Sequence, residues 1–321
     1  LDLWRGEDPW YENTVAALVQ TANGYLWLGT YHGLVRFDGV RFTVFDSSNT
    51  PGLPNSRVTS LFEAGNGTLW IGHETGELTR LREGRFEAVV LAGGWPGGAI
   101  EAMATDAEED LWVLNDAGVL FRVRDGLRLE CPGGAAPNRG AVLARQQNGT
   151  LWVTADGQIG KVDADTVRRF QFPGAPEGEY YQRVAGGRRG ALWLVNNQGR
   201  IRKWTAARGW EEDPGALPEG AGVASAVLER RDGGLVVGTL TQGLYVFAPG
   251  EAPQHFSREN GLSHNWVRCL CEDHEGNIWI GTGGGLDTLR PRKVSMLRPP
   301  DGLQGCAALS FDVGKDGALW V

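Results

Sequence analysis

The sequence predicts an all-β protein, a seven-bladed β-propeller made of four-stranded antiparallel blades. Three observations predict this fold. One short motif recurs about every 42 residues, each repeat offers four short β-type runs, and no window carries an apolar stripe of helical period long enough for a helix. Glycine is also frequent, at 48 of 321 residues against a typical share of ~7%. Without a collagen-like period or a serine-rich tract, this excess indicates many turns.

The recurring motif places a tryptophan between aliphatic residues, just before a glycine-containing loop. Its first copy is "NGYLWLGTYHGLVRF" at 23–37, and a last copy breaks off at "DGALWV" at 316–321. The tryptophan position holds Trp27, Trp70, Trp112, Trp152, Trp193, Val236, Trp279 and Trp320, at successive spacings of 40 to 43 residues. Eight copies at so regular a spacing indicate a repeat architecture, which forms one domain whatever its length.

Each repeat contains four β-type runs in a fixed order. In the first repeat these are "TVAALVQ" (14–20), "YLWLGT" (25–30), "GLVRF" (33–37) and "RFTVF" (41–45). An Asn-Gly, Asp-Gly or Glu-Gly pair before the tryptophan strand predicts a hairpin turn, because these residues tolerate positive φ. Four antiparallel strands in about 40 to 45 residues are typical of a propeller blade.

The number of blades follows from the tryptophan positions. Seven periods separate Trp27 from Trp320, so a closed seven-bladed ring would bring the eighth motif back over the first. An eight-bladed ring is the alternative, but residues 307–321 and the N-terminal "LDLW" would leave one strand of its last blade missing. We therefore expect a seven-bladed propeller over 1–298 and the start of a further repeat, a truncated blade or a second propeller, over 299–321. Leu1 to Trp4 should complete the outer edge of the last blade and hide an open sheet edge.

The repeated tryptophan is expected to pack between neighbouring blades, where such a ring can bury ~150–250 Å². Val236 keeps this position apolar, as a packing role predicts. The glycine that opens each third strand is expected to serve the backbone conformation of the turn. These glycines are Gly33, Gly76, Gly118, Gly157, Gly199, Gly243 and Gly285.

The motif "N-G-x-L-W-[IL]-G-T-x-x-G-L-x-R-F", with "GLPNSRVTSLFE" (52–63) and "NGLSHNWVRCLCEDHEGNIWIGT" (260–282) around it, resembles the two-component regulator propeller repeat. The resemblance covers nearly the whole chain, although repeats three to five depart from it at the Gly-Thr pair. It implies an extracytoplasmic or periplasmic sensor domain of a bacterial membrane receptor, with a histidine kinase or diguanylate cyclase output domain elsewhere in the full-length protein. On this basis we expect no enzymatic activity in this segment. A homodimer formed through the full-length receptor is the protein partner that the resemblance allows.

The variable loops at one face of the ring are the predicted ligand site, because propellers usually work through loops near the central channel. Between the second and third strands, the repeats agree at the flanks and differ in the loop. Aromatic rings, amides and carboxylates there suit a small polar ligand such as an oligosaccharide. The candidate residues are Trp10, Tyr11, Tyr31, His32, His73, Glu74, Trp95, Asn115, Asp116, Tyr180, Tyr181, Asn196, Asn197 and His264. Trp266 begins a strand and is expected to be a core residue instead.

Two other functions are open at this stage. His32 and His73 occupy equivalent loops in adjacent repeats and Glu74 adds a carboxylate, so a lyase or glycosidase is one alternative. A protein-docking scaffold is the other, and it predicts a broad exposed apolar patch on the ring.

Composition excludes several further classes. The net charge is −8 with scattered lysines and arginines, which argues against nucleic-acid binding. No apolar run approaches ~18 residues, so no membrane contact is expected from this segment itself. Cys131, Cys269, Cys271 and Cys306 form no CxxC or histidine pairing, and we expect neither a metal nor a cofactor.

Overall fold

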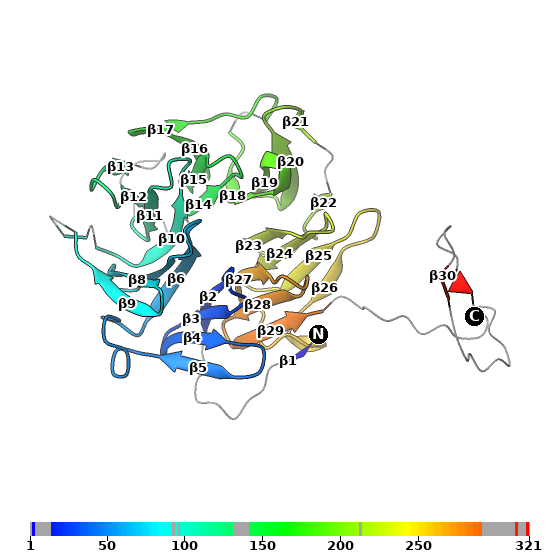
Figure 1. The fold of residues 1–321 in the computed structure, drawn as a ribbon. Coiled ribbons are helices and arrows are strands. Elements are labelled where there is room, and N and C mark those ends of the chain that lie inside the picture. Colours follow the sequence, from blue (N-terminus) through cyan, green and yellow to red (C-terminus); the bar gives the residue numbers. More distant parts are fainter. Residues whose placement is uncertain are drawn as a thin grey trace. The chain divides into compact units, whose positions relative to one another are not determined.

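The computed structural model describes residues 2–3, 14–91, 94–95, 97–130, 141–176, 178–211, 214–290, 312–313 and 319–320. The chain divides into two compact units, Leu1–Arg290 and Pro291–Val321. The first unit contains seven antiparallel sheets, which are the seven predicted blades (Figure 1). Only two short 3-10 turns accompany them in the described residues, η1 (Arg188–Gly190) and η2 (Arg258–Asn260).

We number the blades 1 to 7 along the chain and describe each blade's strands from the centre outward. The innermost strands are β2 (Val15–Gln20), β6 (Val58–Glu63), β10 (Ile100–Thr105), β14 (Val142–Arg145), β18 (Tyr181–Gly186), β23 (Ala224–Glu229) and β27 (Val267–Glu272). The second strands are β3 (Leu26–Thr30), β7 (Leu69–His73), β11 (Leu111–Asn115), β15 (Leu151–Ala155), β19 (Ala191–Asn196), β24 (Leu235–Thr239) and β28 (Ile278–Thr282).

The third strands are β4 (Gly33–Phe37), β8 (Leu78–Arg82), β12 (Val119–Arg122), β16 (Gln158–Asp163), β20 (Arg200–Thr205), β25 (Leu244–Phe247) and β29 (Gly285–Leu289). The outer strands of blades 1 to 4 and 6 are β5 (Phe42–Phe45), β9 (Arg85–Val89), β13 (Arg128–Glu130), β17 (Thr166–Arg169) and β26 (Gln254–Phe256). In blade 5 two short strands, β21 (Gly209–Trp210) and β22 (Gly215–Ala216), both pair with β20.

The outer strand of blade 7 comes from the other end of the chain. β1 (Asp2–Leu3) pairs with β29 through Asp2 opposite Thr288 and Leu3 opposite Asp287. The predicted completion of the last blade by the N-terminus is confirmed for these two residues. The pairing covers a sheet edge that would otherwise present unpaired backbone groups.

The ring closes because each innermost strand contacts the innermost strands of both neighbouring blades, including β27 with β2. The blades pack through apolar clusters that join two consecutive sheets, such as Trp279 and Leu286 of blade 7 with Val35 and Phe37 of blade 1. Trp27, Trp112, Trp152, Trp193 and Trp279 are at most 5% exposed and Val236 is fully buried, whereas Trp70 is half-buried. This burial is what a packing role for the repeated position requires.

Hydrogen bonds at the ends of the innermost strands join four pairs of neighbouring blades. The side chain of the last strand residue accepts a hydrogen bond from a backbone N–H in the preceding blade. Gln20 accepts from His274, Glu63 from Ala22, Glu229 from Arg188 and Glu272 from Arg231, at 2.6–3.1 Å. The last strand residues of blades 3, 4 and 5 are instead Thr105, Arg145 and Gly186.

The second unit contains two paired antiparallel strands, β30 (Asp312–Val313) and β31 (Leu319–Trp320). A hairpin of this kind corresponds to the first two strands of a blade. The interpretation of residues 299–321 as the start of a further repeat stays a prediction.

Candidate functional site

The loops between second and third strands lie on the same face as the segments that enter the innermost strands. Backbone hydrogen bonds join the two sets within each of five blades. Glu74 N–H donates to Arg57, Asp116 to Ala99, Asn197 to Tyr180, Leu240 to Val223 and Gly283 to Trp266. We call this surface the loop face. This is the face on which the sequence analysis predicts the ligand site.

Glycine is required where the loop turns back into the third strand. All seven glycines predicted to serve the turn have positive φ. Gly243 has a φ of +84°, and a Cβ added to it would lie 2.2 Å from the carbonyl oxygen of Phe256. Only a residue without a side chain fits this conformation and this contact.

Five side chains of blades 7, 1 and 2 form a connected group on the loop face, which we call the rim cluster: Tyr31, Arg57, Glu74, Trp266 and Arg268. The Arg268 Nη1 donates to the Tyr31 hydroxyl at 3.0 Å. The guanidinium carbon of Arg57 lies 4.6 Å from the centre of the Tyr31 ring, and that of Arg268 lies 4.6 Å from the Trp266 ring. Arg57 Nε also pairs with Glu74 at 2.5 Å. The two guanidinium groups therefore hold the aromatic rings in place.

Trp266 is a correction to the sequence analysis. It is 38% exposed and lies at the surface, not in the core. The glycine-rich loop "TGGG" explains its position: a Cβ on Gly283 would lie 3.2 Å from both the Trp266 ring and His264 Nδ1. The absence of side chains in this loop lets Trp266 and His264 lie over it.

Charged side chains also lie on the innermost strands. Glu101 belongs to blade 3, Arg183 to blade 5 and Arg268 to blade 7, so they can act on one another only across the central channel. Burial raises the pKa of Glu101 above its usual value, while the positive charges of Arg268 and Arg183 act to lower it. Asp116 adds to the upward shift. The Glu101 carboxylate therefore lies within electrostatic range of both guanidinium groups.

The sequence analysis missed Arg57, Glu101, Arg183 and Arg268. A signal was present for two of them, because Glu101 and Arg268 stand directly after the first residue of an innermost strand, Ile100 or Val267, which is fully or almost fully buried. The repeats place Thr59 and Ser225 at the same position. A charged residue there, in an otherwise apolar strand, marks a side chain that faces the channel.

The structure places the candidate residues in three groups. His32, Tyr180, Asn197 and His264 are exposed on the loop face, and Tyr31, Glu74, Trp95 and Asp116 are partly exposed. Trp10 and Tyr11 lie outside the described residues. The remaining four, His73, Asn115, Tyr181 and Asn196, are buried. A ligand role for the first two groups stays a prediction.

His73, Asn115 and Asn196 are corrections, because their side chains serve the fold. His73 is fully buried, its Nε2 lies 2.9 Å from Thr79 Oγ1, and burial lowers its pKa to about 4. Asn115 accepts from the Val119 N–H and donates to the Gly97 carbonyl. Asn196 accepts from the Arg200 N–H in the same way. These amides cap the turn before the third strand, which is a common role of asparagine in loops.

Tyr181 is a further correction and belongs to a buried network in blade 5. Its hydroxyl donates to Glu179 at 2.7 Å, and Glu179 also accepts from Asn196 at 2.8 Å and from Arg202 at 3.4 Å. Burial and the neighbouring Glu179 carboxylate raise the pKa of Tyr181. This network fixes the segment that enters β18.

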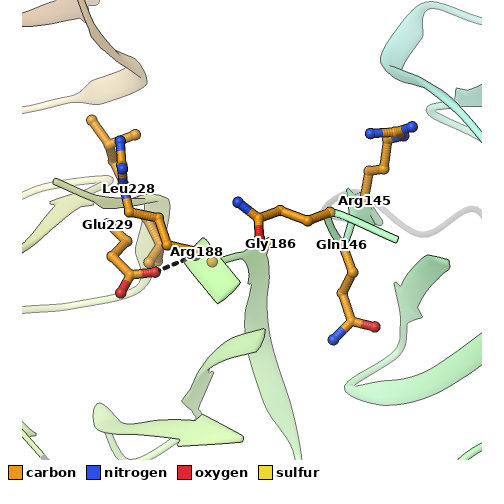
Figure 2. Close-up of a pocket in the computed structure, with 9 residues that line it drawn as sticks. Arg145, Gln146, Gly186, Arg188, Leu228 and Glu229 are labelled. Carbon is orange, nitrogen blue, oxygen red and sulfur yellow. Dashed lines mark hydrogen bonds between the residues drawn. The ribbon is translucent and has the colours of Figure 1, made fainter. Parts of the chain in front are cut away.

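Several hollows in the described structure lie away from the rim cluster, and two of them involve blade 5. One, of ≈ 340 Å³, lies between blades 4 and 5 beside Phe172 and Glu179. The other, of ≈ 260 Å³, lies on the opposite face, where the innermost strands of blades 4 to 6 end. Figure 2 shows Arg145 and Gln146 on one side of this second hollow and Leu228 and Glu229 on the other.

Several known structures and one family are similar to this chain. The sequence profile of the family described as two component regulator propeller matches residues 12–32, 52–75 and 261–284. The extracellular domain of BT4673 from B. thetaiotaomicron, described as a candidate one-component or hybrid two-component system, is similar with a TM-score of 0.68 and 18% identity. That match covers 96% of this chain and 43% of the other.

Two more solved structures show the same fold. The extracellular domain of BT3049 from B. thetaiotaomicron has a TM-score of 0.64 and 18% identity over 86% of this chain and 40% of its own. Virginiamycin B lyase from Staphylococcus aureus has a TM-score of 0.69 and 15% identity over 86% of this chain and 94% of its own. This chain thus spans less than half of the two extracellular domains. No curated protein matches the sequence.

Identities of this size establish the fold and no more. The family itself rests on the repeat motif, which the profile finds in blades 1, 2 and 7, the blades in which the motif is best preserved. The chain is therefore a seven-bladed β-propeller that carries two-component regulator propeller repeats.

Proposed function

We propose that this chain is the ligand-sensing domain of a bacterial signalling receptor, that it lies outside the cytoplasm, and that it binds a small polar ligand such as an oligosaccharide on the loop face. The rim cluster carries the proposal. It presents a partly exposed tryptophan and tyrosine, two guanidinium groups and a carboxylate at the mouth of the channel. Such a mixture of aromatic faces and a few polar groups is typical of small-molecule sites.

The comparisons support the extracytoplasmic part of this proposal. The repeats match the two component regulator propeller family, and two similar structures are extracellular domains of candidate signalling systems. In the described residues, no helix has the length and apolar character needed to cross a bilayer. A receptor of this kind would need further segments to carry a signal to the cytoplasm.

The structure weakens the lyase or glycosidase alternative. That hypothesis requires His32, His73 and Glu74 to act together on a bound substrate. His73 is fully buried and bonded to Thr79, and Glu74 is paired with Arg57. A histidine enclosed in this way cannot reach a substrate on the loop face.

The scaffold alternative requires a broad apolar surface. The large apolar side chains exposed in the described residues are Val40, Val90, Tyr180, Val223, Leu240 and Trp266. They belong to blades 1, 2, 5, 6 and 7, and this distribution favours a small-ligand site over a docking surface.

The proposal is tested by measuring saccharide binding to the 321-residue chain with isothermal titration calorimetry. A panel of neutral and acidic mono- and disaccharides should contain at least one ligand that binds, and Trp266→Ala should weaken its binding at least tenfold. Val40→Ala, which changes an exposed apolar residue in the β4–β5 turn, is the control and should bind as the parent does. If no saccharide binds, the ligand class is wrong, and if saccharide binding survives Trp266→Ala, the place of the site beside Trp266 on the loop face is wrong.

A further inference from the structure

The guanidinium group of Arg268 is held in place, and no described residue neutralises it directly. It donates to the Tyr31 hydroxyl at 3.0 Å and lies over the rings of Trp266 and Tyr31 at 4.6 and 5.5 Å. Among the described residues, Arg268 has no carboxylate within the 4.0 Å of a salt bridge. A guanidinium group has five N–H donors, and this arrangement uses one of them.

Arg183 is in a similar position on the innermost strand of blade 5. Its Nε donates to the Ala224 carbonyl at 3.1 Å, and this is the one hydrogen bond of its side chain within the described part of the chain. Burial lowers the pKa of Arg183, and the Glu101 carboxylate partly offsets this effect. The Glu101 carboxylate therefore acts electrostatically on both Arg183 and Arg268. Neither guanidinium group forms a direct ion pair with it.

Arg57 is a third arginine near this group, and it contacts Tyr31. It pairs with Glu74 through Nε, and its guanidinium carbon lies 4.6 Å from the Tyr31 ring centre. Since the Arg268 guanidinium lies over the same ring, the two groups converge on one tyrosine. Both rest on a rigid base, because Arg57 directly precedes the innermost strand of blade 2 and Arg268 belongs to that of blade 7.

We propose that the ligand of the loop face carries a carboxylate, which is bound by Arg268 at the channel mouth beside Trp266, with Arg57 near the same tyrosine ring and Arg183 on the innermost strand of blade 5. This inference rests on the proposed function and names its ligand class. A carboxylate matches the fork of N–H donors that a guanidinium group presents, and such charged hydrogen bonds are the strong ones. The chain as a whole carries a net charge of −8, so an anion must be attracted by local positive charge and not by the overall field.

The exposed ring of Trp266 provides the second half of the site. The ring is 38% exposed while Arg268 lies over it, so the ring and the guanidinium group present one continuous surface. An apolar face next to a carboxylate is found in an acidic sugar and also in a small organic acid. The carboxylate is common to both, and the experiment must separate them.

The test compares ligands that differ in the carboxylate alone. Binding of galacturonate, galactose, succinate and sodium chloride to the 321-residue chain is measured by isothermal titration calorimetry at one ionic strength. Galacturonate should bind at least tenfold more tightly than galactose, because a charge-assisted hydrogen bond contributes about 1.5–3 kcal/mol, or roughly ten- to a hundredfold. Comparable binding of succinate would show a free organic acid as the ligand class, whereas weak succinate binding would show an acidic sugar.

Arg268→Gln and Arg85→Gln are the matched variants, since both remove one positive charge. Arg85 is exposed on the outer strand β9, far from the channel in the order of strands. Arg268→Gln should lose at least tenfold in galacturonate affinity and lose less in galactose affinity, so that the preference for galacturonate over galactose falls, and Arg85→Gln should behave as the parent. Circular dichroism and thermal denaturation of both variants check that they are folded.

The outcomes separate this inference from the proposed function. If galactose or another neutral sugar binds as tightly as galacturonate and Trp266→Ala abolishes binding, the carboxylate inference is wrong and the proposed sensor site stands. If acidic ligands bind equally to the parent and to Arg268→Gln, Arg268 is not their site and the inference is also wrong. If neither class of ligand binds, both proposals fall.

Discussion

At the scale of single residues, the tryptophan of three blades is bonded to the residue six positions before it. Trp279 Nε1 donates to Asp273 at 2.8 Å, Trp152 to Gln146 at 2.9 Å and Trp112 to Asp106 at 2.7 Å. In blade 5 the corresponding residue is Gly187, and Trp193 Nε1 has no hydrogen-bond partner in the described structure. The indole N–H at this position therefore donates a hydrogen bond in three blades and has no partner within the described residues in blade 5.

This difference predicts unequal effects of the same substitution. Trp279→Phe should lower the free energy of unfolding by about 1–3 kcal/mol more than Trp193→Phe, because only the first removes a hydrogen bond to a buried carboxylate, whose Oδ2 then keeps Asn277 Nδ2 as its donor. Both tryptophans are 5% exposed, so the loss of apolar contact is comparable. Urea denaturation of the two variants gives the comparison, and equal losses would show that the hydrogen bond contributes nothing.

Asp287 predicts a pH dependence of stability. It is fully buried, and burial raises its pKa to about 6 although Ser263 donates two hydrogen bonds to it. A carboxyl whose folded pKa is raised stabilises the fold fully below its unfolded pKa, near 4, and this contribution is lost as the pH rises through about 6.

Asp287→Asn should remove this dependence. The amide stays neutral and its oxygen can still accept from the Ser263 N–H. Relative to the parent, the variant should gain on the order of 3 kcal/mol between pH 4 and pH 8, because each pKa unit corresponds to about 1.4 kcal/mol. Denaturation at several pH values measures the difference, and parallel pH profiles for parent and variant would contradict the assignment.

Single residues were also where sequence reasoning about the site failed most. A polar residue in a variable loop can either face the ligand or cap its own turn, and the two are indistinguishable in one sequence. Asn115 and Asn196 cap, while Asn197 is exposed one position later. Whether a histidine such as His73 is buried depends on Thr79 of the next strand, a contact that the repeat motif does not encode.

At the scale of elements, the ends of the innermost strands hold the blades together. Glu229 accepts from the Arg188 N–H at 2.6 Å and from Lys203 Nζ at 3.0 Å, and its side chain is 5% exposed. The same position in blades 3 to 5 carries no glutamate or glutamine. These are also the repeats that depart from the motif at the Gly-Thr pair.

Glu229→Ala should therefore destabilise the propeller by about 2–4 kcal/mol, because it leaves a backbone N–H and an ammonium group without their acceptor. Glu229→Gln retains an acceptor for the N–H and should cost less. Glu251→Ala, in an exposed turn of blade 6, is the control and should stay within about 0.5 kcal/mol of the parent. Thermal and urea denaturation rank the three variants. If Glu229→Ala is as stable as the control, the hydrogen bonds of Glu229 do not stabilise the propeller.

The strands and turns were the part of the structure that the sequence predicted best. The hairpin turns and the alternation of apolar residues located the strands, because both signals are local. Blade 5 differs in having its outer strand divided between β21 and β22, with Trp210 and Gly215 both opposite residues of β20. Nothing in the local pattern distinguishes a divided outer strand from a continuous one.

At the scale of the whole molecule, the spacing of the tryptophans predicted the ring and its seven blades. The count followed from one period, and closure by the N-terminus followed from the need to cover an open sheet edge. The side chains in the channel were harder to predict. Glu101, Arg183 and Arg268 come from blades 3, 5 and 7, and only the closed ring brings them to a common space.

Removing β1 tests the closure directly. Deletion of residues 1–3 leaves the edge of β29 unpaired, so the melting temperature should fall and the chain should associate through the open edge. Deletion of residues 319–321, which removes β31 of the second unit, is the matched control. Light scattering and thermal denaturation compare the two, and a truncated chain that remains monomeric with an unchanged melting temperature would show that β1 does not secure the ring.

The pairing of β1 with β29 also fixes an order of events during synthesis. Asp2 leaves the ribosome roughly 290 residues before its partner, Thr288. At 5–20 residues per second, this separation corresponds to about 15 to 60 s of translation. During that time blades 1 to 6 can each complete their own sheets, while the first strand has no partner. The ring is thus completed when β1 pairs with β29, and it stays open until blade 7 has emerged from the ribosome.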